Sequence, residues 1–338
     1  MADDNRQWIL RRRPTGALTE EVFELETSPI PIPGAGEVLI RVLELSLDPA
    51  NRVWIVGPSY RAAVEVGAVM DGFAIGKVIR SEDPAIAEGA YVTGDLGWQD
   101  YAVRAAADLE VVPRETKRPL SHYLGVLGIT GLTAYFGLLD VGRAKPRETV
   151  LISGAAGATG SVVGQIAKMW GCRVVGIAGT KAKCDWLVDD LKFDAAINYR
   201  EQDLPKAIRE TCPDRVDLYF DNVGGKTLEA ALFAMRDRGR VVCCGAISGY
   251  DLSKPQPSPF GIPGLLIGRR LKMQGFIVMD YAHRFRDGRQ ALAGWIDSGH
   301  VQVKEDRVDG LEQAPRGLMG LLAGENIGKR YVHVADEG

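Results

Sequence analysis

The sequence is poor in the residues that build disulfide frameworks and zinc sites. Its 338 residues include five cysteines and four histidines, and no two cysteines are spaced as in a Cys-x-x-Cys pair. No cysteine precedes Cys172, and His122 is the one histidine in the first half of the chain. A zinc site needs three or four converging ligands, and an odd number of cysteines does not suit a disulfide framework. We therefore expect reduced thiols that serve mostly as packing residues, and no metal.

An excess of charge of one sign and long apolar runs are also lacking. The chain has 41 lysine and arginine residues against 44 aspartate and glutamate residues, which gives a net charge of -3. Such a balance offers no electrostatic attraction to nucleic acid or to an anionic membrane. No segment reaches the roughly eighteen uninterrupted apolar residues of a membrane-spanning helix, and the start is acidic rather than apolar. We expect a cytoplasmic protein that binds neither nucleic acid nor membrane.

What is present divides the chain into two patterns. Over about the first 120 residues, short apolar runs are separated by glycine and proline, which is typical of a mostly antiparallel, partly closed barrel. These runs are Gln7–Leu10, Glu37–Val42, Ala74–Ile79 and Tyr101–Val103. From about Tyr123, helical intervals alternate with short apolar strands, as in a doubly wound parallel sheet of the Rossmann type. These strands are Val150–Ile152, Arg173–Ala178, Ala195–Tyr199, Val216–Asp221 and Arg240–Cys244.

The predicted fold is therefore α/β with two domains. We assign residues 1–125 and 301–338 to the β-rich domain, to which a last strand, Tyr331–Val334, would return. Residues 126–300 would form the α/β domain. Within it, the proline-rich segment Pro255–Pro263 is expected to be a loop near the reactive end of a bound cofactor, and Leu271–Val278 a further strand.

A glycine-rich turn joins two of the predicted strands. The run Val150–Ile152 leads into Ser153–Gly160, and a helical segment then precedes the strand Arg173–Ala178. In a βαβ unit of this length, the first turn and the helix N-terminus hold the phosphates of a dinucleotide. Gly157 would let the backbone approach a pyrophosphate, and Gly160 would let the helix pack close to the sheet. One glycine of the usual G-x-G-x-x-G is an alanine here, so the fingerprint is partial.

The residues after the second strand indicate which dinucleotide binds. A site for NAD normally carries Asp or Glu about twenty residues after the fingerprint, where it bonds the ribose 2′-OH. This chain has Gly179 and Thr180 there, followed by Lys181 and Lys183. A small residue followed by lysines leaves room and charge for a 2′-phosphate, so NADP is favoured and Lys183 is the preferred partner. The alternative is that both lysines lie on a solvated helix face.

Three strand ends carry further candidate residues, because ligands bind beyond the carboxyl ends of parallel strands. Asn222 follows one strand and precedes two glycines, which indicates either a cofactor contact or a plain Asx turn. Tyr199 ends another strand and is either a cofactor contact or an exposed aromatic. Cys244 is interpreted as a small packing residue rather than a nucleophile, since no lysine or histidine lies nearby in sequence.

With these motifs in place, the chain resembles the zinc-independent medium-chain dehydrogenases/reductases, in the branch of prostaglandin reductase, leukotriene hydroxydehydrogenase, plant double-bond reductases and bacterial curcumin reductase. The resemblance covers nearly the whole chain and rests on ordered motifs. They are Asn5–Trp8, Leu47–Pro49, Gly131–Tyr135, Ala155–Ala167, Asp221–Gly225, Cys244–Tyr250, Gly275–Val278 and Gly324–Lys329. The resemblance implies a GroES-like barrel beside the Rossmann domain, usually in a homodimer, and NADPH-dependent reduction of carbon-carbon double bonds conjugated to a carbonyl.

The same resemblance implies a set of cofactor-binding residues. They are Ala156, Gly157, Ala158, Thr159 and Gly160 at the pyrophosphate; Thr180, Lys183 and Tyr199 toward the 2′-phosphate; Asn222 and Cys244 under the dinucleotide; and Thr133, Phe276, Val278 and Asn326 around the nicotinamide half. Tyr250 matches a tyrosine credited in relatives with binding or protonating near the reacting carbonyl. Around Asn51 the chain departs from many relatives, which leaves the identity of the enone or enal substrate open.

The chemistry of the reaction gives Tyr250 two possible tasks. A phenol is protonated at neutral pH and can donate a hydrogen bond to an enolate oxygen or a proton to the α-carbon. Solvent could deliver that proton instead, which would leave Tyr250 to packing or cofactor contact. Two alternative activities on this scaffold are quinone reduction and zinc-free alcohol oxidation, and the alternative of another class is an NADPH-binding protein with a structural or sensing role.

Overall fold

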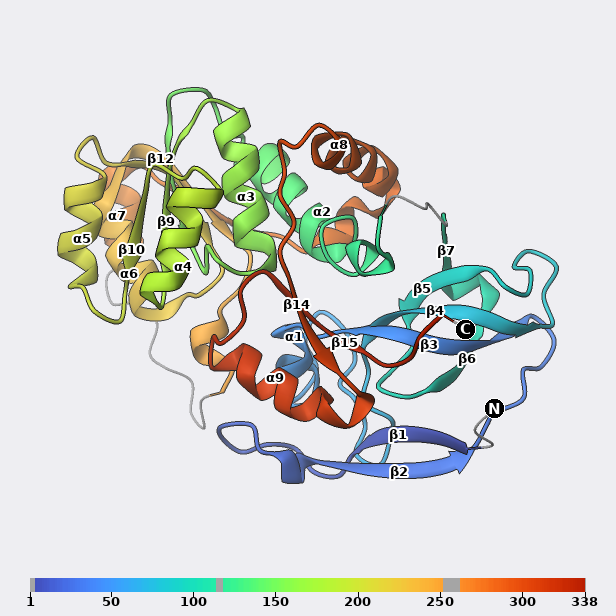
Figure 1. Ribbon diagram of the computed structural model, residues 1–338. Coiled ribbons are helices and arrows are strands. Elements are labelled where there is room, and N and C mark those ends of the chain that lie inside the picture. Colours follow the sequence, from blue (N-terminus) through green and yellow to red (C-terminus); the bar gives the residue numbers. More distant parts are fainter. Residues whose placement is uncertain (1–3, 114–117, 252–261, 338) are drawn as a thin grey trace. The chain divides into compact units, whose positions relative to one another are not determined.

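The computed structural model describes residues 4–113, 118–251 and 262–337, and these residues form two compact units (Figure 1). One unit comprises residues 1–125 and 305–338, and the other comprises residues 126–304. The predicted fold class, a Rossmann-type parallel sheet plus a β-rich partly closed barrel, is confirmed.

A parallel sheet forms the centre of the second unit. Its strands are β8 (Thr149–Ser153), β9 (Arg173–Ala178), β10 (Ala195–Asn198), β11 (Val216–Asp221), β12 (Met235–Cys243) and β13 (Lys272–Gly275). They lie in the order β10-β9-β8-β11-β12-β13, and every neighbouring pair is parallel. The order reverses between β8 and β11, which is the switch point where open α/β sheets bind ligands.

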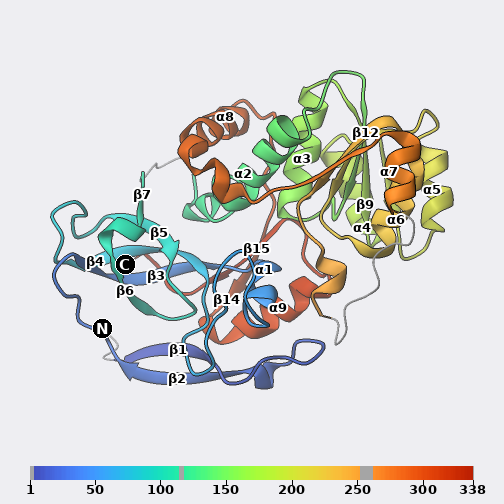
Figure 2. The same ribbon diagram turned by 180° about the vertical axis from the view of Figure 1, so that it is seen from behind.

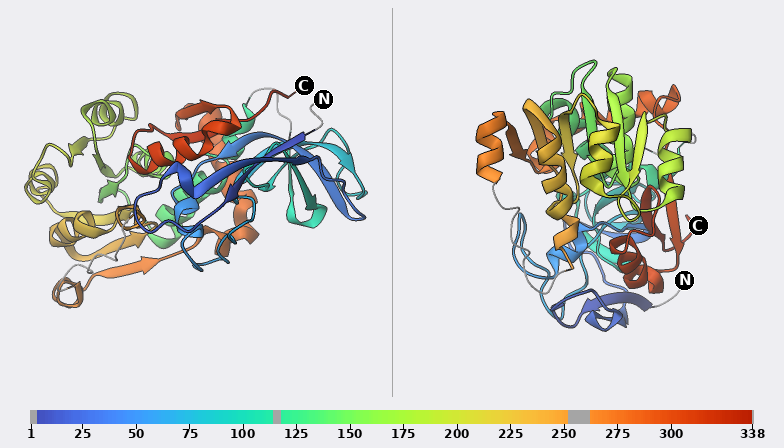
Figure 3. Two further views of the ribbon diagram at one scale, coloured as in Figure 1. Left: turned by 90° about the horizontal axis from the view of Figure 1, so that it is seen from below. Right: turned by 90° about the vertical axis from the view of Figure 1, so that its left-hand side faces the viewer.

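Helices cover both faces of this sheet, which explains why its central strands are mostly apolar. The helices are α2 (Ile129–Phe136), α3 (Ala158–Met169), α4 (Lys181–Asp185), α5 (Leu204–Thr211), α6 (Gly225–Ala234), α7 (Ile262–Arg269) and α8 (Phe285–Asp297). Helices α2, α3 and α8 gather on one face, and α5 and α6 lie on the other (Figures 1 and 2). The right-hand view of Figure 3 shows the strands between the two helical layers. All five residues of β8 are buried, as expected for a strand covered on both faces.

The barrel-like unit contains a mostly antiparallel sheet and a separate hairpin. Its strands are β1 (Asp4–Leu10), β2 (Phe23–Pro29), β3 (Glu37–Ser46), β4 (Phe73–Ser81), β5 (Tyr91–Asp95), β6 (Tyr101–Ala105), β7 (Glu110–Val112), β14 (Glu305–Asp309) and β15 (Lys329–His333). The helices are α1 (Ala50–Trp54) and α9 (Ala314–Leu322), and a 3-10 turn, η3 (Leu120–Tyr123), precedes the second unit. Strand β15 pairs with β3, so the predicted return of the last strand is confirmed.

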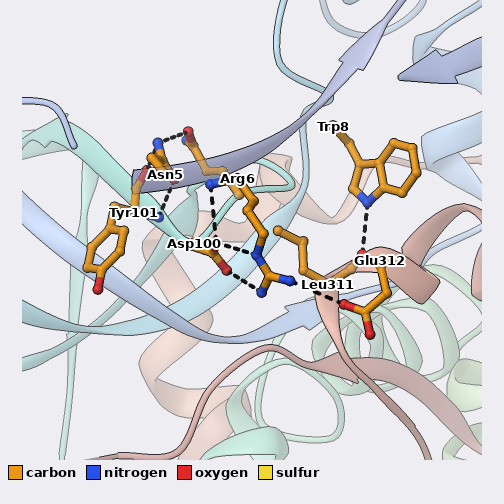
Figure 4. Close-up of polar contacts among 8 residues, drawn as sticks. Asn5, Arg6, Trp8, Asp100, Tyr101, Leu311 and Glu312 are labelled. Carbon is orange, nitrogen blue, oxygen red and sulfur yellow. Dashed lines mark hydrogen bonds and ion pairs between the residues drawn. The ribbon is translucent and has the colours of Figure 1, made fainter. Parts of the chain in front are cut away.

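The N-terminal motif Asn5–Trp8 holds the β1–β2 hairpin to this unit (Figure 4). Asn5 donates to the carbonyl of Tyr101 at 2.9 Å and accepts from the Tyr101 amide at 2.9 Å. The guanidinium of Arg6 lies 2.8 Å from the Asp100 carboxylate, and the indole of Trp8 donates to the Leu311 carbonyl at 2.8 Å. The motif Asn5–Trp8 therefore has a structural role in this unit.

Two predictions about the last third of the chain were wrong in part. The predicted strand Leu271–Val278 ends at Gly275 in β13, and a 3-10 segment, η7 (Val278–Arg284), begins soon after. An apolar run at a sheet edge has a partner strand on one side only, and alternation alone does not reveal where that pairing stops. The predicted loop Pro255–Pro263 lies mostly outside the described residues, but Pro263 belongs to α7, where proline is tolerated in the first turn.

Candidate functional site

The candidate site of the α/β unit lies at the carboxyl edge of its sheet. The strands β8, β9, β10, β11 and β12 are mutually parallel, so their last residues share one edge. Ser153, Asn198, Asp221 and Cys243 stand at or next to these strand ends and are followed by the predicted binding residues.

The turn after β8 has the shape that a pyrophosphate requires. Gly154 has a φ of +58°, which favours glycine, and its backbone is exposed. A Cβ at Gly160 would lie 2.4 Å from the Gly154 carbonyl oxygen, so the close approach of the helix to this turn requires glycine. Gly157 precedes the first turn of α3, and no side chain caps this helix N-terminus. Unsatisfied amide groups and the helix dipole make this end of α3 a suitable cradle for an anion.

Ala156, Ala158 and Thr159 lie in the turn after β8 and in the first turn of α3. Ala156 is buried beneath the turn, whereas Ala158 and Thr159 open the first turn of α3 and are half-buried. Small side chains leave the amide groups of this turn accessible. The five residues predicted for the pyrophosphate are therefore contiguous around one helix N-terminus.

Beyond β9, the structure separates the two candidate lysines. Thr180 caps α4 by accepting from the Lys183 amide at 3.3 Å. Lys183 is buried, with 8% of its surface exposed, whereas Lys181 is exposed and pairs with Asp185 at 2.6 Å. The solvated-face alternative therefore fits Lys181 and does not fit Lys183.

Tyr199 and a residue not included in the prediction lie over Gly179. A Cβ at Gly179 would lie 3.0 Å from Tyr199 Cε1 and 3.3 Å from Arg200 Nε. The Arg200 guanidinium carbon is 5.8 Å from the centre of the Tyr199 ring, close enough for a cation-π contact. Arg200 directly follows Tyr199 and is exposed, so its position after the strand end was the signal that could have identified it.

Asn222 is tied to the neighbouring strand rather than pointing away from it. Its side-chain amide donates to the Ser153 carbonyl at 2.7 Å, and its backbone amide donates to the Ser153 hydroxyl at 3.0 Å. Its own carbonyl accepts from the Ile247 amide at 3.3 Å. Asn222 therefore connects the segments that follow β8, β11 and β12. These bonds reach beyond its own turn, as a plain Asx turn would not.

The two adjacent cysteines lie beside the same strand ends. The backbone amides of Cys244 and Gly245 donate to the Asp221 carbonyl at 2.8 and 3.1 Å. Burial, and secondarily the Asp221 carboxylate, raise the pKa of the Cys243 thiol to about 11 and that of Cys244 to about 12. All five cysteines are free thiols, and these two have none of the low pKa that marks a nucleophile.

Tyr250 is held in the turn after β12. Its hydroxyl oxygen accepts from the Ala246 amide at 3.1 Å, and a Cβ at Gly245 would lie 3.5 Å from the same oxygen. The bond to Ala246 uses an oxygen lone pair and not the hydroxyl hydrogen. This bond fixes the Tyr250 oxygen in the turn that follows β12.

Thr133, Phe276 and Val278 lie in one part of the α/β unit. Thr133 is half-buried on α2 and bonds back to the Ile129 carbonyl at 2.7 Å. A Cβ at Gly137, one turn later, would lie 2.7 Å from the Phe276 ring. Val278, buried at the start of η7, follows Phe276 by two residues. The structure therefore places Phe276 near the end of α2 but shows no direct contact that assigns the three residues a role.

Asn326 and Asn51 belong to the other unit. The buried Asn326 donates to the Gly328 carbonyl at 2.8 Å, as in a turn. The buried Asn51 accepts from the Asp48 amide at 2.8 Å, close to the start of α1. Asn326 belongs to a family motif, whereas Asn51 lies where the chain departs from many relatives, and hydrogen bonds hold both side chains in place.

Other features of the described residues do not coincide with the predicted site. A cavity of about 430 Å³ in the barrel-like unit is lined by Arg6, Arg41, Asp100 and Tyr101 among others, and it includes none of the predicted binding residues. Within residues 4–113, 118–251 and 262–337, no group of three histidine, cysteine or acidic side chains is arranged to hold a metal. No helix in these ranges is both long and apolar enough to cross a bilayer.

Two family descriptions match the chain in consecutive parts. The family described as the N-terminal domain of oxidoreductases matches residues 6–112. The family described as zinc-binding dehydrogenase matches residues 158–294. Together these matches extend over both units.

Individual proteins are similar over the full length. The NADPH-dependent curcumin reductase of Escherichia coli is 39% identical over 338 residues, with 98% of each chain covered. Mouse prostaglandin reductase 1 is 41% identical over 331 residues, covering 97% of this chain and 98% of the mouse protein. The crystal structure of CurA from Vibrio vulnificus in complex with NADPH is 39% identical, with a TM-score of 0.93 and 98% and 99% of the two chains covered.

Proposed function

The chain belongs to the zinc-independent branch of the medium-chain dehydrogenase/reductase family, and we propose that it uses NADPH to reduce the carbon-carbon double bond of α,β-unsaturated ketones or aldehydes. The observation that carries the proposal is the carboxyl edge of the sheet, where an uncapped helix N-terminus, a buried lysine and a tied Asn222 turn follow adjacent strands. The named activities of full-length relatives supply the reaction class.

The residues of the α/β unit would hold the cofactor along this edge. The amide groups from Ala156 to Gly160 would receive the pyrophosphate. Thr180, Lys183 and Tyr199 would surround the 2′-phosphate, with Arg200 beside them. Asn222 and Cys244 would lie beneath the dinucleotide, and Thr133, Phe276 and Val278 would border the nicotinamide half. When bound, NADPH supplies the hydride that is delivered to the β-carbon of the substrate.

Tyr250 is the proposed catalytic residue. Its oxygen is fixed by the Ala246 amide, and we propose that the phenol donates to the substrate carbonyl and so stabilises the enolate oxygen. It could also deliver the proton that the α-carbon requires. A Tyr250→Phe variant should lower kcat about tenfold or more with little change in the KM for NADPH. Full kcat in that variant would remove Tyr250 from the chemistry.

The proposed activity is tested by following the consumption of NADPH with a panel of enones, enals, quinones and alcohols. Turnover of enones or enals is the expected result. Preference for quinones or alcohols would favour the quinone reductase or zinc-free alcohol dehydrogenase alternative. Binding of NADPH without turnover of any compound would favour a structural or sensing protein.

Cofactor choice has its own test at Lys183. A Lys183→Ala variant should lose affinity for NADPH far more than for NADH, because NADH lacks the 2′-phosphate. A matched Lys181→Ala variant should keep both affinities, since Lys181 is exposed and paired with Asp185. Equal losses for NADPH and NADH in the Lys183 variant would reject the 2′-phosphate assignment.

We further propose that the protein is a cytoplasmic homodimer. Strand β13 ends the order of the parallel sheet, and β12 is its one neighbour among the described strands. Exposed Ile277 and Met279 follow it. An edge strand with exposed apolar residues beside it suits pairing with a second copy. Sedimentation equilibrium would give twice the chain mass if this is correct, and the mass of one chain if it is not.

A further inference from the structure

One carboxylate oxygen organises the turns beneath the proposed nicotinamide site. Asp221, with 2% of its surface exposed, ends β11. Its Oδ1 atom accepts four hydrogen bonds, from the Ser153 hydroxyl at 3.0 Å, the Tyr219 hydroxyl at 2.7 Å, and the amides of Val223 and Gly224 at 3.0 and 2.9 Å. All four donors are neutral. The carboxylate is therefore satisfied by four directed hydrogen bonds from neutral groups rather than by a cation.

The Ser153 and Tyr219 hydroxyls differ in the other hydrogen bonds that they make. Ser153 and Tyr219 are both fully buried, and each donates to the same oxygen. The Ser153 hydroxyl also accepts a hydrogen bond from the Asn222 amide at 3.0 Å, which connects it to the Asn222 turn. The Ser153 carbonyl accepts from the Asn222 side chain at 2.7 Å. Ser153 thus stands between the buried charge and Asn222.

The direction of these bonds is fixed by the chemistry of the groups. An ionised carboxylate can only accept, so the single hydrogen of the Ser153 hydroxyl points to Asp221. The Ser153 oxygen then has lone pairs to offer the Asn222 amide. Because the hydroxyl donates to an anion, it is polarised and becomes a stronger acceptor. The chain of bonds runs from Asn222 through Ser153 to Asp221.

The topology places Asn222 apart from the adenosine half of the cofactor. Strands β9 and β10, which carry Lys183 and Tyr199 beyond their ends, lie on one side of β8. Strand β11 lies on the other side. A dinucleotide that crosses the switch point with its pyrophosphate at α3 therefore has its nicotinamide half over the Asn222 turn.

This inference rests on the proposed NADPH site. We propose that Ser153 is a positioning residue. By bonding both the Asp221 carboxylate and Asn222, it fixes the turn over which the nicotinamide half of the cofactor would lie. The role is specific to Ser153. The Tyr219 hydroxyl is hydrogen-bonded to the Asp221 carboxylate and to the Ser153 side chain, but it has no bond to the Asn222 turn among the contacts described above.

The test compares Ser153→Ala with its matched control, Tyr219→Phe, in the full-length protein. Each variant removes one hydroxyl from the same buried oxygen, so their thermal midpoints should fall by similar amounts. Affinities are measured by fluorescence titration for NADPH and for 2′,5′-ADP, which represents the adenosine half alone. Ser153→Ala should bind NADPH about tenfold more weakly and 2′,5′-ADP as the wild type does. Tyr219→Phe should stay within about twofold for both ligands.

An Asn222→Ala variant completes a double-mutant cycle. If Ser153 acts through Asn222, the double variant should lose no more NADPH affinity than the larger single loss. Additive losses would overturn the relay, as would equal NADPH affinities in Ser153→Ala and Tyr219→Phe. A parallel loss of both ligands in Ser153→Ala would indicate general loosening and would also overturn it. Wild-type protein that binds 2′,5′-ADP but not NADPH, or neither, would overturn the proposed function itself.

Discussion

Each unit holds a carboxylate that is buried or partly buried, and the two carboxylates are satisfied in different ways. In the α/β unit, Asp221 accepts from four neutral donors. In the barrel-like unit, Asp48 lies 2.6 Å from the Lys329 ammonium, whose side chain is 5% exposed, and it also accepts from the Ser46 hydroxyl. Neutral donors hold an anion by their directions, whereas an ammonium holds it mainly by charge. We infer that Asp221 serves to orient the turns at the sheet edge, whereas Asp48 serves to attach one segment of the barrel-like unit to another.

The attachment in the barrel-like unit joins distant parts of the chain. The Lys329 ammonium also donates to the Leu47 carbonyl at 3.0 Å, so it bonds two consecutive residues of the Leu47–Pro49 motif. Lys329 itself ends the Gly324–Lys329 motif. The same three-stranded face carries Glu44 and Glu305, so charge dominates this region well beyond one pair.

The largest effect is expected when the cation is removed. A Lys329→Met variant leaves the partly buried Asp48 without its ion partner and should lower the free energy of unfolding by about 3 kcal/mol. Urea denaturation of the full-length protein measures this loss. The matched control is Lys206→Met, because Lys206 forms an exposed pair with Glu210 at 3.8 Å and should change stability little. Similar small losses in both variants would mean that charge does not hold the barrel-like unit together.

A pH effect of intermediate size should also be confined to the charged region. Burial, the Glu305 carboxylate and the more distant Glu337 raise the pKa of Glu44 from 4.5 to about 7, against the opposing effect of Arg307. The folded protein therefore holds this proton more tightly than the unfolded chain. The stability it contributes is complete below pH 4.5 and is lost as pH rises through about 7.

The measurement for Glu44 is the unfolding free energy at a series of pH values. We expect the unfolding free energy to fall across that window, and a Glu44→Gln variant should show a flatter profile. His333 is the cross-strand neighbour of Glu44, so a His333→Gln variant is the control. A profile that Glu44→Gln leaves unchanged, but His333→Gln flattens, would assign the effect to the histidine.

The smallest effects on the free energy of unfolding are expected when each of the two carboxylates is replaced by an amide. Asparagine keeps an oxygen acceptor but loses the charge, so Asp221→Asn can still serve neutral donors and should cost about 1 kcal/mol. Asp48→Asn leaves the buried Lys329 without its anion and should cost about twice as much. Thermal and urea unfolding of both variants give the comparison. A reversed order would show that Asp221 depends on charge more than on its hydrogen-bond geometry.

Periodicity and turn residues were enough to predict most of the fold. The strands of the α/β unit and the turn from Ser153 to Gly160 follow from local patterns, because apolar runs and glycines act over a few residues. The pairing of Lys329 with Asp48 spans 281 positions and has no local signal. The same is true of Ser153, whose hydroxyl looks like one more residue of a glycine-rich turn until Asn222 is folded beside it.

Other differences have equally physical causes. Strand β12 begins at Met235, earlier than its apolar core indicates, because exposed residues such as Arg236 and Asp237 still belong to the strand. Arg200 was missed because it is a charged residue on the surface, where most arginines have no ligand. The predicted binding residues remain predictions, and the structure adds the contacts that make each of them testable.

The high pKa of the Cys243 and Cys244 thiols has a consequence for an enzyme of electrophilic alkenes. Conjugated enones and enals alkylate thiolates by Michael addition, and the thiolate rather than the thiol is the reactive form. With pKa values of about 11 and 12, on the order of one Cys243 thiol in ten thousand is ionised at neutral pH, and fewer at Cys244. Burial of these two thiols, with a smaller contribution from the Asp221 carboxylate, would thereby protect them from alkylation by the protein's own proposed substrates.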